Sequence, residues 1–130
     1  MPELVATSPV TGEVLGTFST PGAEQVRAML ERARAAQASW GALSVARRLE
    51  PLRELKNLLI DEMDEVVAAI AAATGKPHVE GLTGDLMVCV DMLHHYERHA
   101  EQDLAPEPRK GGLLYMLSTF SVEYLPLGVV

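Results

Sequence analysis

The chain has 130 residues, of which 48% are hydrophobic and 22% charged, and its formal net charge is −7. This composition is typical of a folded globular chain. We expect neither nucleic acid nor a membrane as a partner, because no run of Lys or Arg offers the basic surface that phosphates or anionic lipids need. No stretch reaches the roughly 18 apolar residues of a membrane span.

The first element that we expect is a small β-hairpin between Leu4 and Ser19. Ser8-Pro9-Val10-Thr11-Gly12-Glu13 has turn chemistry, since proline fixes φ and glycine tolerates positive φ. The β-prone runs Leu4-Val5-Ala6 and Val14–Phe18 flank that turn. The first ten residues, Met1–Val10, lack the basic and apolar regions of a secretory signal, so we expect no signal peptide.

Two amphipathic helices are expected next. The first begins at Thr20-Pro21, with the hydroxyl at the N-cap and proline at N1, and is broken by Gly41. Ser44 can cap the second, although Pro51 means that this helix either kinks there or begins near Glu50. Its apolar face is Leu52, Leu55, Leu59, Met63, Val66 and Ile70. Thr74-Gly75-Lys76-Pro77 supplies a C′ glycine and then a proline, which predicts its end.

A third helix is expected from Pro77, which suits N1, to the prolines Pro106 and Pro108. Gly81 and Gly84 weaken its first turns. The apolar side consists of Leu82, Leu86, Cys89, Val90, Leu93, Tyr96 and Ala100.

The last block, Gly111–Val130, changes from helical to extended character. Leu113–Val122 is a dense apolar run, and we expect two strands joined by a bend near Pro126, or one long strand with a break. Both faces of such a strand are apolar, so it needs cover on both sides, from more of the chain or from a partner chain. The fold class is therefore a mixed α/β fragment, with a hairpin and about three helices in residues 1–110 and an extended β-arm in 111–130.

No catalytic set emerges from these residues. Cys89 lies between Val88 and Val90 without a cationic neighbour to lower its pKa, so we interpret it as a buried structural thiol rather than a nucleophile. A single cysteine also favours a reducing, cytoplasmic location. Asp61, Glu62, Asp64 and Glu65 fit a solvated helix face better than acid–base catalysis. Lys76 and Lys110 are too isolated to form phosphate loops.

The histidines form the densest chemical cluster. His95 and His99 are four residues apart and share a helix face, which is a spacing of metal ligands. The zinc-protease pattern needs Glu directly after the first histidine, but Tyr96 follows His95, and His78 is the one other candidate ligand. A solvated helix end with partly charged imidazoles is the alternative, and we favour it over a metal site.

Four phrases in order resemble the aldehyde dehydrogenase superfamily. Ser8–Leu15 resembles the family's opening NPATGEVL, and Ala33–Trp40 resembles its A…AF..W helix end. Thr74-Gly75-Lys76-Pro77, followed by Glu80, resembles ETGKPLAEA, and Val122–Val130 resembles YEPLGVV. The sequence departs from the family at Ala73, where an acidic residue is usual, at His78, where an aliphatic one is, and at Pro51, where the family has uninterrupted helix.

The resemblance implies the N-terminal segment of an enzyme that oxidises aldehydes through a cysteine thiohemiacetal and hydride transfer to NAD or NADP. The family's asparagine, glutamate, catalytic cysteine and cofactor loop all lie after the matched phrases, so the resemblance implies no catalytic, cofactor-binding or metal residue here and an inactive segment. It implies scaffold on the dinucleotide-binding domain instead.

The resemblance also implies an assembly role, because Gly112–Tyr124 resembles the family's bridging β-arm that joins subunits into a homo-oligomer. The candidate oligomerisation residues are Leu113, Leu114, Tyr115, Met116, Leu117, Phe120 and Val122. The partner is then the rest of the dehydrogenase chain or another copy of this one. The apolar ending Leu127–Val130 favours a truncated chain. The alternative is a free-standing truncated relative that acts as an assembly or regulatory module through its β-arm.

Overall fold

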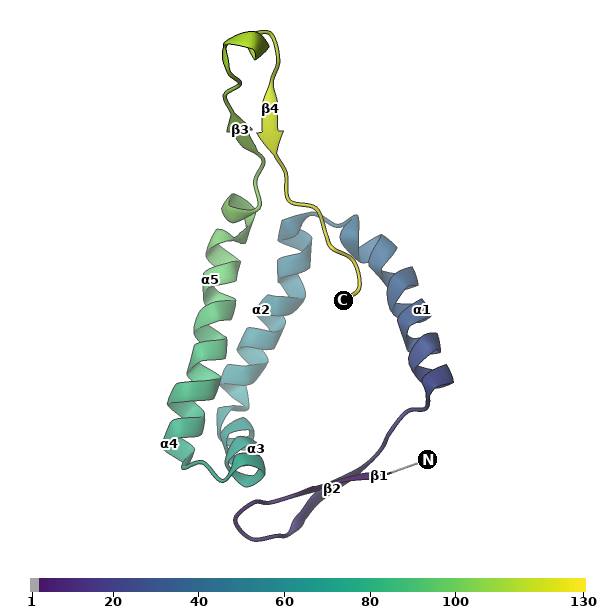
Figure 1. Cartoon of the computed structure of the whole chain (residues 1–130). Coiled ribbons are helices and arrows are strands. Elements are labelled where there is room, and N and C mark those ends of the chain that lie inside the picture. Colours follow the sequence, from purple (N-terminus) through teal and green to yellow (C-terminus); the bar gives the residue numbers. More distant parts are fainter. Residues whose placement is uncertain (1–2) are drawn as a thin grey trace.

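The computed structural model describes residues 3–130. The first two residues of Met1–Val10, the segment in which we expect no secretory signal, therefore lie outside it. Figure 1 shows a mixed α/β chain with a β-hairpin at one end, helices in the middle and a second, smaller hairpin at the other end. The expected order of a hairpin followed by helices is confirmed.

The N-terminal hairpin is formed by β1 (Glu3–Thr7) and β2 (Val14–Ser19), which pair antiparallel. Ser8 closes the turn: its amide donates to the Glu13 carbonyl at 2.9 Å, and its carbonyl accepts from the Gly12 amide at 2.9 Å. Gly12 has a φ of 75°, a left-handed value that favours glycine. The predicted turn is therefore confirmed down to its glycine.

Helix α1 (Ala23–Gly41) begins later than the sequence indicates. Its N-cap is Gly22 rather than Thr20, and the Gln25 side chain accepts a hydrogen bond from the Gly22 amide at 2.9 Å. This side-chain cap sets the start beyond Pro21. The expected end at Gly41 is confirmed.

The expected second helix is two helices, α2 (Val45–Asp61) and α3 (Met63–Thr74). Ser44 caps α2 by accepting from the Arg47 amide at 3.3 Å, and the helix continues through Pro51, so the alternative start near Glu50 is wrong. The continuous helix to Thr74 is also wrong, because Glu62 leaves the helical conformation with φ −101° and ψ 23°. In Figure 1, α3 turns sharply away from α2.

The third helical stretch changes geometry along its length. It consists of α4 (His78–Glu80), a π-helical stretch η1 (Gly81–Leu86) and α5 (Met87–Asp103), with Pro77 at the N-cap rather than at N1. The π-helical turns coincide with the two glycines that weaken the predicted helix. Gly81 is buried against α3, where an added Cβ would lie 3.3 Å from Ile70 Cγ2. The glycine therefore permits the close approach of α3 and η1.

The second hairpin differs from the expected long strands. Strand β3 (Glu107–Arg109) pairs antiparallel with β4 (Phe120–Val122), and a 3-10 turn, η2 (Leu113–Tyr115), lies between them. Most of Leu113–Val122 is therefore a structured loop, and no strand is assigned from Glu123 onward in the described chain. Strand β3 precedes residue 111, where the sequence places the start of the arm. The final segment returns toward the helices (Figure 1).

The core of the described chain is small. Three apolar residues are buried, Leu49 on α2, Val67 on α3 and Leu86 at the end of η1. The chain exposes 10352 Å², whereas a folded monomer of this mass is expected to expose about 6,700 Å². None of the described helices is both long and apolar enough to cross a membrane. The fold is thus open, with apolar faces that its own residues do not cover.

Candidate assembly surface

The seven candidate oligomerisation residues lie together on the second hairpin, which stands clear of the helices in Figure 1. Five follow one another through η2 and the loop, and two lie on β4. Their exposed fractions are 80% for Leu113, 92% for Leu114, 57% for Tyr115, 75% for Met116, 103% for Leu117, 41% for Phe120 and 40% for Val122. We call residues 111–122 the arm tip.

The arm tip is organised by its own aromatic residues. The rings of Tyr115 and Phe120 meet edge to face, with centroids 5.8 Å apart. Both pack over Gly111, where an added Cβ would lie 2.6 Å from the Phe120 ring and 3.0 Å from Tyr115 Cβ. The Tyr115 amide also donates to the Gly112 carbonyl at 2.9 Å. The aromatic residues therefore shape the loop, and the aliphatic residues face solvent.

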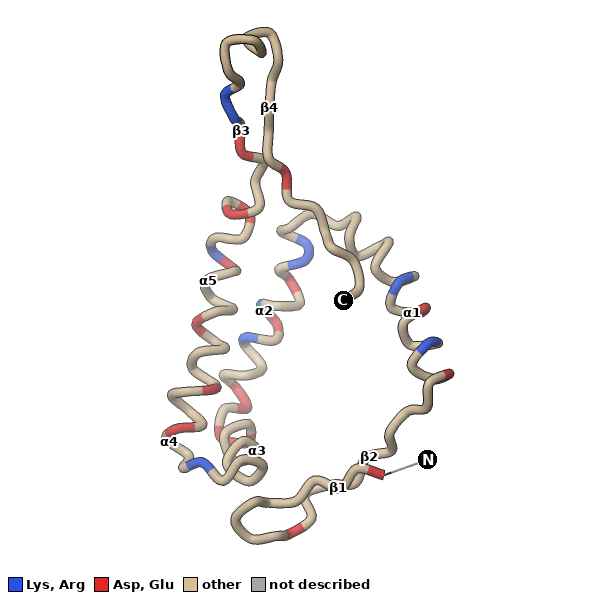
Figure 2. The backbone as a smooth tube through the Cα atoms, in the orientation of Figure 1, with Lys and Arg blue, Asp and Glu red and all other residues tan. Residues whose placement is uncertain are grey.

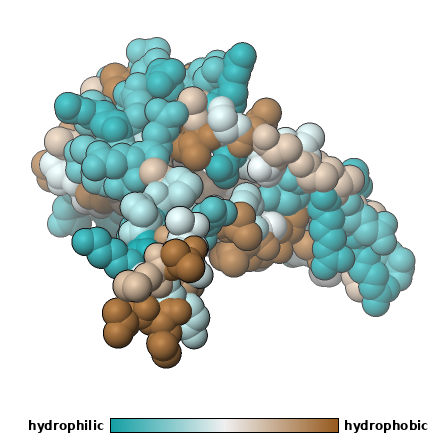
Figure 3. Space-filling view, turned by 90° about the horizontal axis from the view of Figure 1, so that it is seen from above, coloured by the Kyte–Doolittle hydropathy of each residue, from teal (hydrophilic) through white to brown (hydrophobic). Residues whose placement is uncertain are grey.

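The arm tip carries no charge. Residues 111–122 contain no Asp, Glu, Lys or Arg, and in Figure 2 the charged residues of this hairpin lie below its tip. Seen from above, hydrophobic residues gather in a projecting cluster (Figure 3). An exposed apolar cluster of this kind is a candidate contact surface, because leaving it in water is unfavourable.

Ion pairs join α2 to α5, the helix that precedes the arm. Arg53 Nε donates to Glu97 Oε1 at 2.7 Å, and Lys56 Nζ donates to Glu97 Oε2. The hydrogen bonds from Lys56 and then Arg53 lower the pKa of Glu97 to about 2. Glu97 is therefore ionised at neutral pH, and it holds the helix that leads into β3 against its neighbour.

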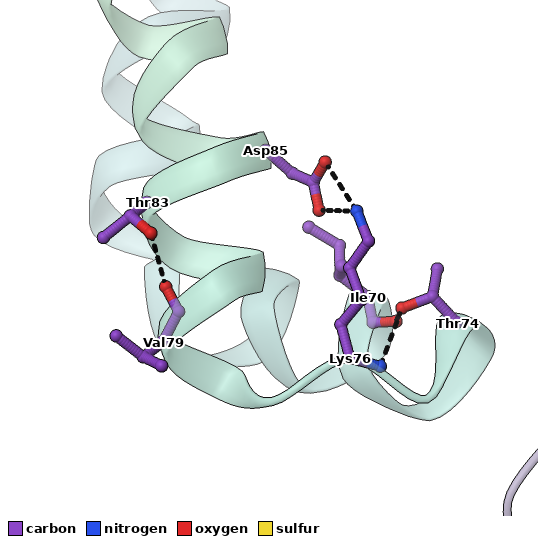
Figure 4. Close-up of polar contacts among 6 residues, drawn as sticks. All are labelled: Ile70, Thr74, Lys76, Val79, Thr83 and Asp85. Carbon is purple, nitrogen blue, oxygen red and sulfur yellow. Dashed lines mark hydrogen bonds and ion pairs between the residues drawn. The ribbon is translucent and has the colours of Figure 1, made fainter.

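The Thr74-Gly75-Lys76-Pro77 motif forms a corner between α3 and the helix that follows (Figure 4). Thr74 Oγ1 donates to the Ile70 carbonyl at 2.7 Å and accepts from the Lys76 amide at 3.3 Å. Lys76 Nζ donates to both Asp85 carboxylate oxygens, at 3.1 and 2.8 Å. Lys76 thus bridges to η1, and the motif has a structural role in this chain. No pattern in the sequence predicts that Asp85 is the partner of Lys76.

The same corner touches the N-terminal hairpin. Gly75 ends α3 with a φ of 76°, and an added Cβ there would lie 2.9 Å from Val10 Cγ2. Two of the segments that resemble the family are therefore neighbours in space: Ser8–Leu15 and Thr74–Pro77.

Apolar clefts line the helices. One of about 290 Å³ lies where α2, α3, η1 and α5 meet, and its lining is entirely apolar: Leu59, Ile60, Met63, Leu82, Leu86, Met87 and Val90. A second, of about 260 Å³, lies among Trp40, Val45, Arg48, Leu49, Leu52, Tyr96, Ala100 and Leu104. Nε of Arg48 is buried and has no hydrogen-bond partner among the described residues. These are surfaces suited to contact with further polypeptide.

The expected burial of Cys89 is wrong, because its side chain on α5 is exposed. The predicted apolar side of this helix is wider than the strip that meets α2, and Cys89 falls outside that strip. His94, His95 and His99 are exposed on the same helix. The described residues hold no group of three or more His, Cys, Asp or Glu side chains arranged to bind a metal ion.

Comparisons with known proteins agree on one family. The model of the aldehyde dehydrogenase family matches residues 2–130. The chain is 30% identical to 4,4'-diapolycopene aldehyde oxidase of Methylomonas sp over 131 aligned positions, which cover 100% of this chain and 25% of that protein.

Solved structures show the same fold. The structure described for cofactor and substrate selection by Gox0499 has a TM-score of 0.86 and 26% identity, over 98% of this chain and 27% of that one. Succinic semialdehyde dehydrogenase from Streptococcus pyogenes, in complex with NADP+, has a TM-score of 0.75 and 25% identity, over 83% of this chain and 24% of that one. The chain thus spans about a quarter of the length of these relatives.

Proposed function

Because the chain belongs to the aldehyde dehydrogenase family, we propose that it is the N-terminal scaffold segment of an NAD(P)-dependent aldehyde dehydrogenase. The parent enzyme oxidises an aldehyde to a carboxylic acid, and NAD or NADP is its cofactor. Two facts support this proposal: the matched relatives are about four times as long, and one of the similar structures contains NADP+. A cytoplasmic location belongs to the proposal, since the single thiol is exposed and has no internal partner.

The observation that carries the scaffold role is the uncovered surface. The chain exposes 10352 Å², about 3,600 Å² more than a compact monomer of its mass. Apolar clefts between the helices account for part of it. Such faces are stable only when more polypeptide covers them, so the segment serves as one layer of a larger domain.

We also propose that the arm tip joins subunits of a homo-oligomer. Its aliphatic residues project from the end of the molecule farthest from the N-terminal hairpin, while the C-terminal segment turns back toward the helices (Figure 1). A second copy of the chain is the partner that we propose for this projecting surface.

Catalysis is tested directly by following NAD(P)H absorbance with the purified chain, aliphatic and aromatic aldehydes, and each cofactor. We expect no aldehyde-dependent reduction, and the same result for Cys89→Ser. Turnover that disappears in Cys89→Ser would overturn the proposal, because the exposed thiol would then be a nucleophile. Turnover that persists in Cys89→Ser would equally contradict an inactive segment.

The alternative function is a free-standing assembly or regulatory module. The preformed arm tip favours it, since Tyr115 and Phe120 shape the loop without a partner. An immunoblot of the source cell against this segment separates the two functions. A band several times larger than a 130-residue chain supports the dehydrogenase segment, and a band at the size of 130 residues supports the module.

A further inference from the structure

One exposed face of α5 carries an acidic and imidazole stripe. Asp91, His95, His99 and Asp103 follow one another at intervals of four residues, and all four side chains are exposed. Residues four apart in a helix are neighbours on its surface. The stripe lies apart from Glu97, which faces α2 through its ion pairs. It is also separate from the arm tip, so its role is independent of the proposed function.

The two imidazoles at the centre of the stripe are close. Their ring centroids are 4.7 Å apart, with the ring planes tilted by 31°. His95 Nε2 lies 4.0 Å from Asp103 Oδ2, one turn beyond His99. Imidazole nitrogens are the ligands that copper, nickel and zinc accept most readily, and flanking carboxylates favour a dication electrostatically.

The sequence alone favours solvated imidazoles, but the two rings lie 4.7 Å apart in the structure, and we propose that His95 and His99 chelate a divalent late transition metal ion on the exposed face of α5. Two protein nitrogens hold the ion, and water fills its remaining positions, since the described residues supply no group of three ligands. Once one imidazole binds the ion, the other is already within reach, so the second bond forms intramolecularly. Because the chelate joins successive turns, metal binding also stabilises the helix.

The chain offers a matched control in His94. It is exposed on the same helix, next to His95, but lies about 100° around the axis and has no histidine four residues away. His78, before η1, is a second isolated imidazole. Single imidazoles bind these ions weakly, so neither residue contributes to chelation.

The test is titration of the chain with Ni²⁺ at pH 7.5, followed by calorimetry and by thermal melts of the helical circular dichroism. We expect one site per chain and a melting temperature that rises with Ni²⁺. His95→Ala and His99→Ala each weaken binding by at least about tenfold and remove the rise in melting temperature. His94→Ala leaves both unchanged.

Two results would overturn the proposal. Binding that is equal in the native chain and in the His95→Ala/His99→Ala double variant would place the ion elsewhere. Binding that all four histidines share equally, without a rise in melting temperature, would show monodentate surface contacts and no chelate. We expect α5 to stay folded in each variant, because all three substitutions replace exposed side chains. Circular dichroism spectra without metal check this for each variant.

Discussion

Charging the arm tip is expected to weaken association of the chain strongly. Leu114 and Leu117 are 92% and 103% exposed, so their full burial in a contact is available to be lost. Burial of one leucine contributes about 1.5 to 3 kcal/mol, and two therefore contribute at least about 3 kcal/mol. Since about 1.4 kcal/mol corresponds to a tenfold change, Leu114→Asp/Leu117→Asp should weaken association by about 100-fold or more.

Sedimentation velocity over a concentration series measures this effect. The control is Val14→Asp, which introduces one negative charge, against two in the double variant, at a 63% exposed apolar residue on the N-terminal hairpin, at the opposite end of the molecule (Figure 1). We expect the control to associate like the native chain. If the double variant associates like the native chain, the arm tip is not the assembly surface. If Val14→Asp then fails to associate, that surface includes the N-terminal hairpin.

Three further predictions concern stability, each read from melts of the helical circular dichroism. The pKa of Glu97 is lowered to about 2, so the contribution of its ion pairs to folding stability is complete above the ordinary glutamate pKa of 4.5 and is lost as the pH falls toward 2. Glu97→Gln should flatten this dependence of stability on pH, and an acid transition that is the same in Glu97→Gln and in the native chain would contradict the prediction. Gly75→Ala should destabilise the chain by at least about 1 kcal/mol, because φ there is 76°. Gly84→Ala, with open space around it, should stabilise the chain by about 0.5 to 1 kcal/mol, and equal effects of the two substitutions would show that the positive φ of Gly75 does not require glycine. Pro51→Ala restores a donor inside α2 at an exposed position, and should stabilise the chain by up to about 3 kcal/mol; an unchanged or lower melting temperature would show that α2 accommodates the proline without cost.

Elements with local causes could be predicted from the sequence. The N-terminal hairpin follows from the turn chemistry around Gly12, and its positive φ is found where expected. Ser44 and Gly75 mark a helix start and a helix end for the same reason, since caps act over three or four residues. The arm is predicted only in part, because its apolar run forms a turn and one short strand rather than long strands, and its role in assembly stays a prediction.

Features set by tertiary packing could not be predicted in this way. Glu62 is a good helix former, yet the chain bends there because α3 packs against Gly81 and not along the axis of α2. Strand β3 contains Pro108, and proline argues against a strand unless it lies at an edge. The ion pairs of Glu97 join residues more than 40 positions apart, and no local pattern predicts such a pairing.

The uncovered surface of the chain is larger than a second copy of the chain could cover through the arm tip. A standard interface takes about 800 Å² from each partner, whereas this chain exposes about 3,600 Å² more than a compact monomer. Pairing through the arm tip would cover only one projecting end of the molecule. The clefts between α2, α3 and α5 would stay exposed, because they lie along the helices and not at the tip. Under the proposed scaffold role, further polypeptide would cover the clefts along the helices and a second subunit would cover the arm tip.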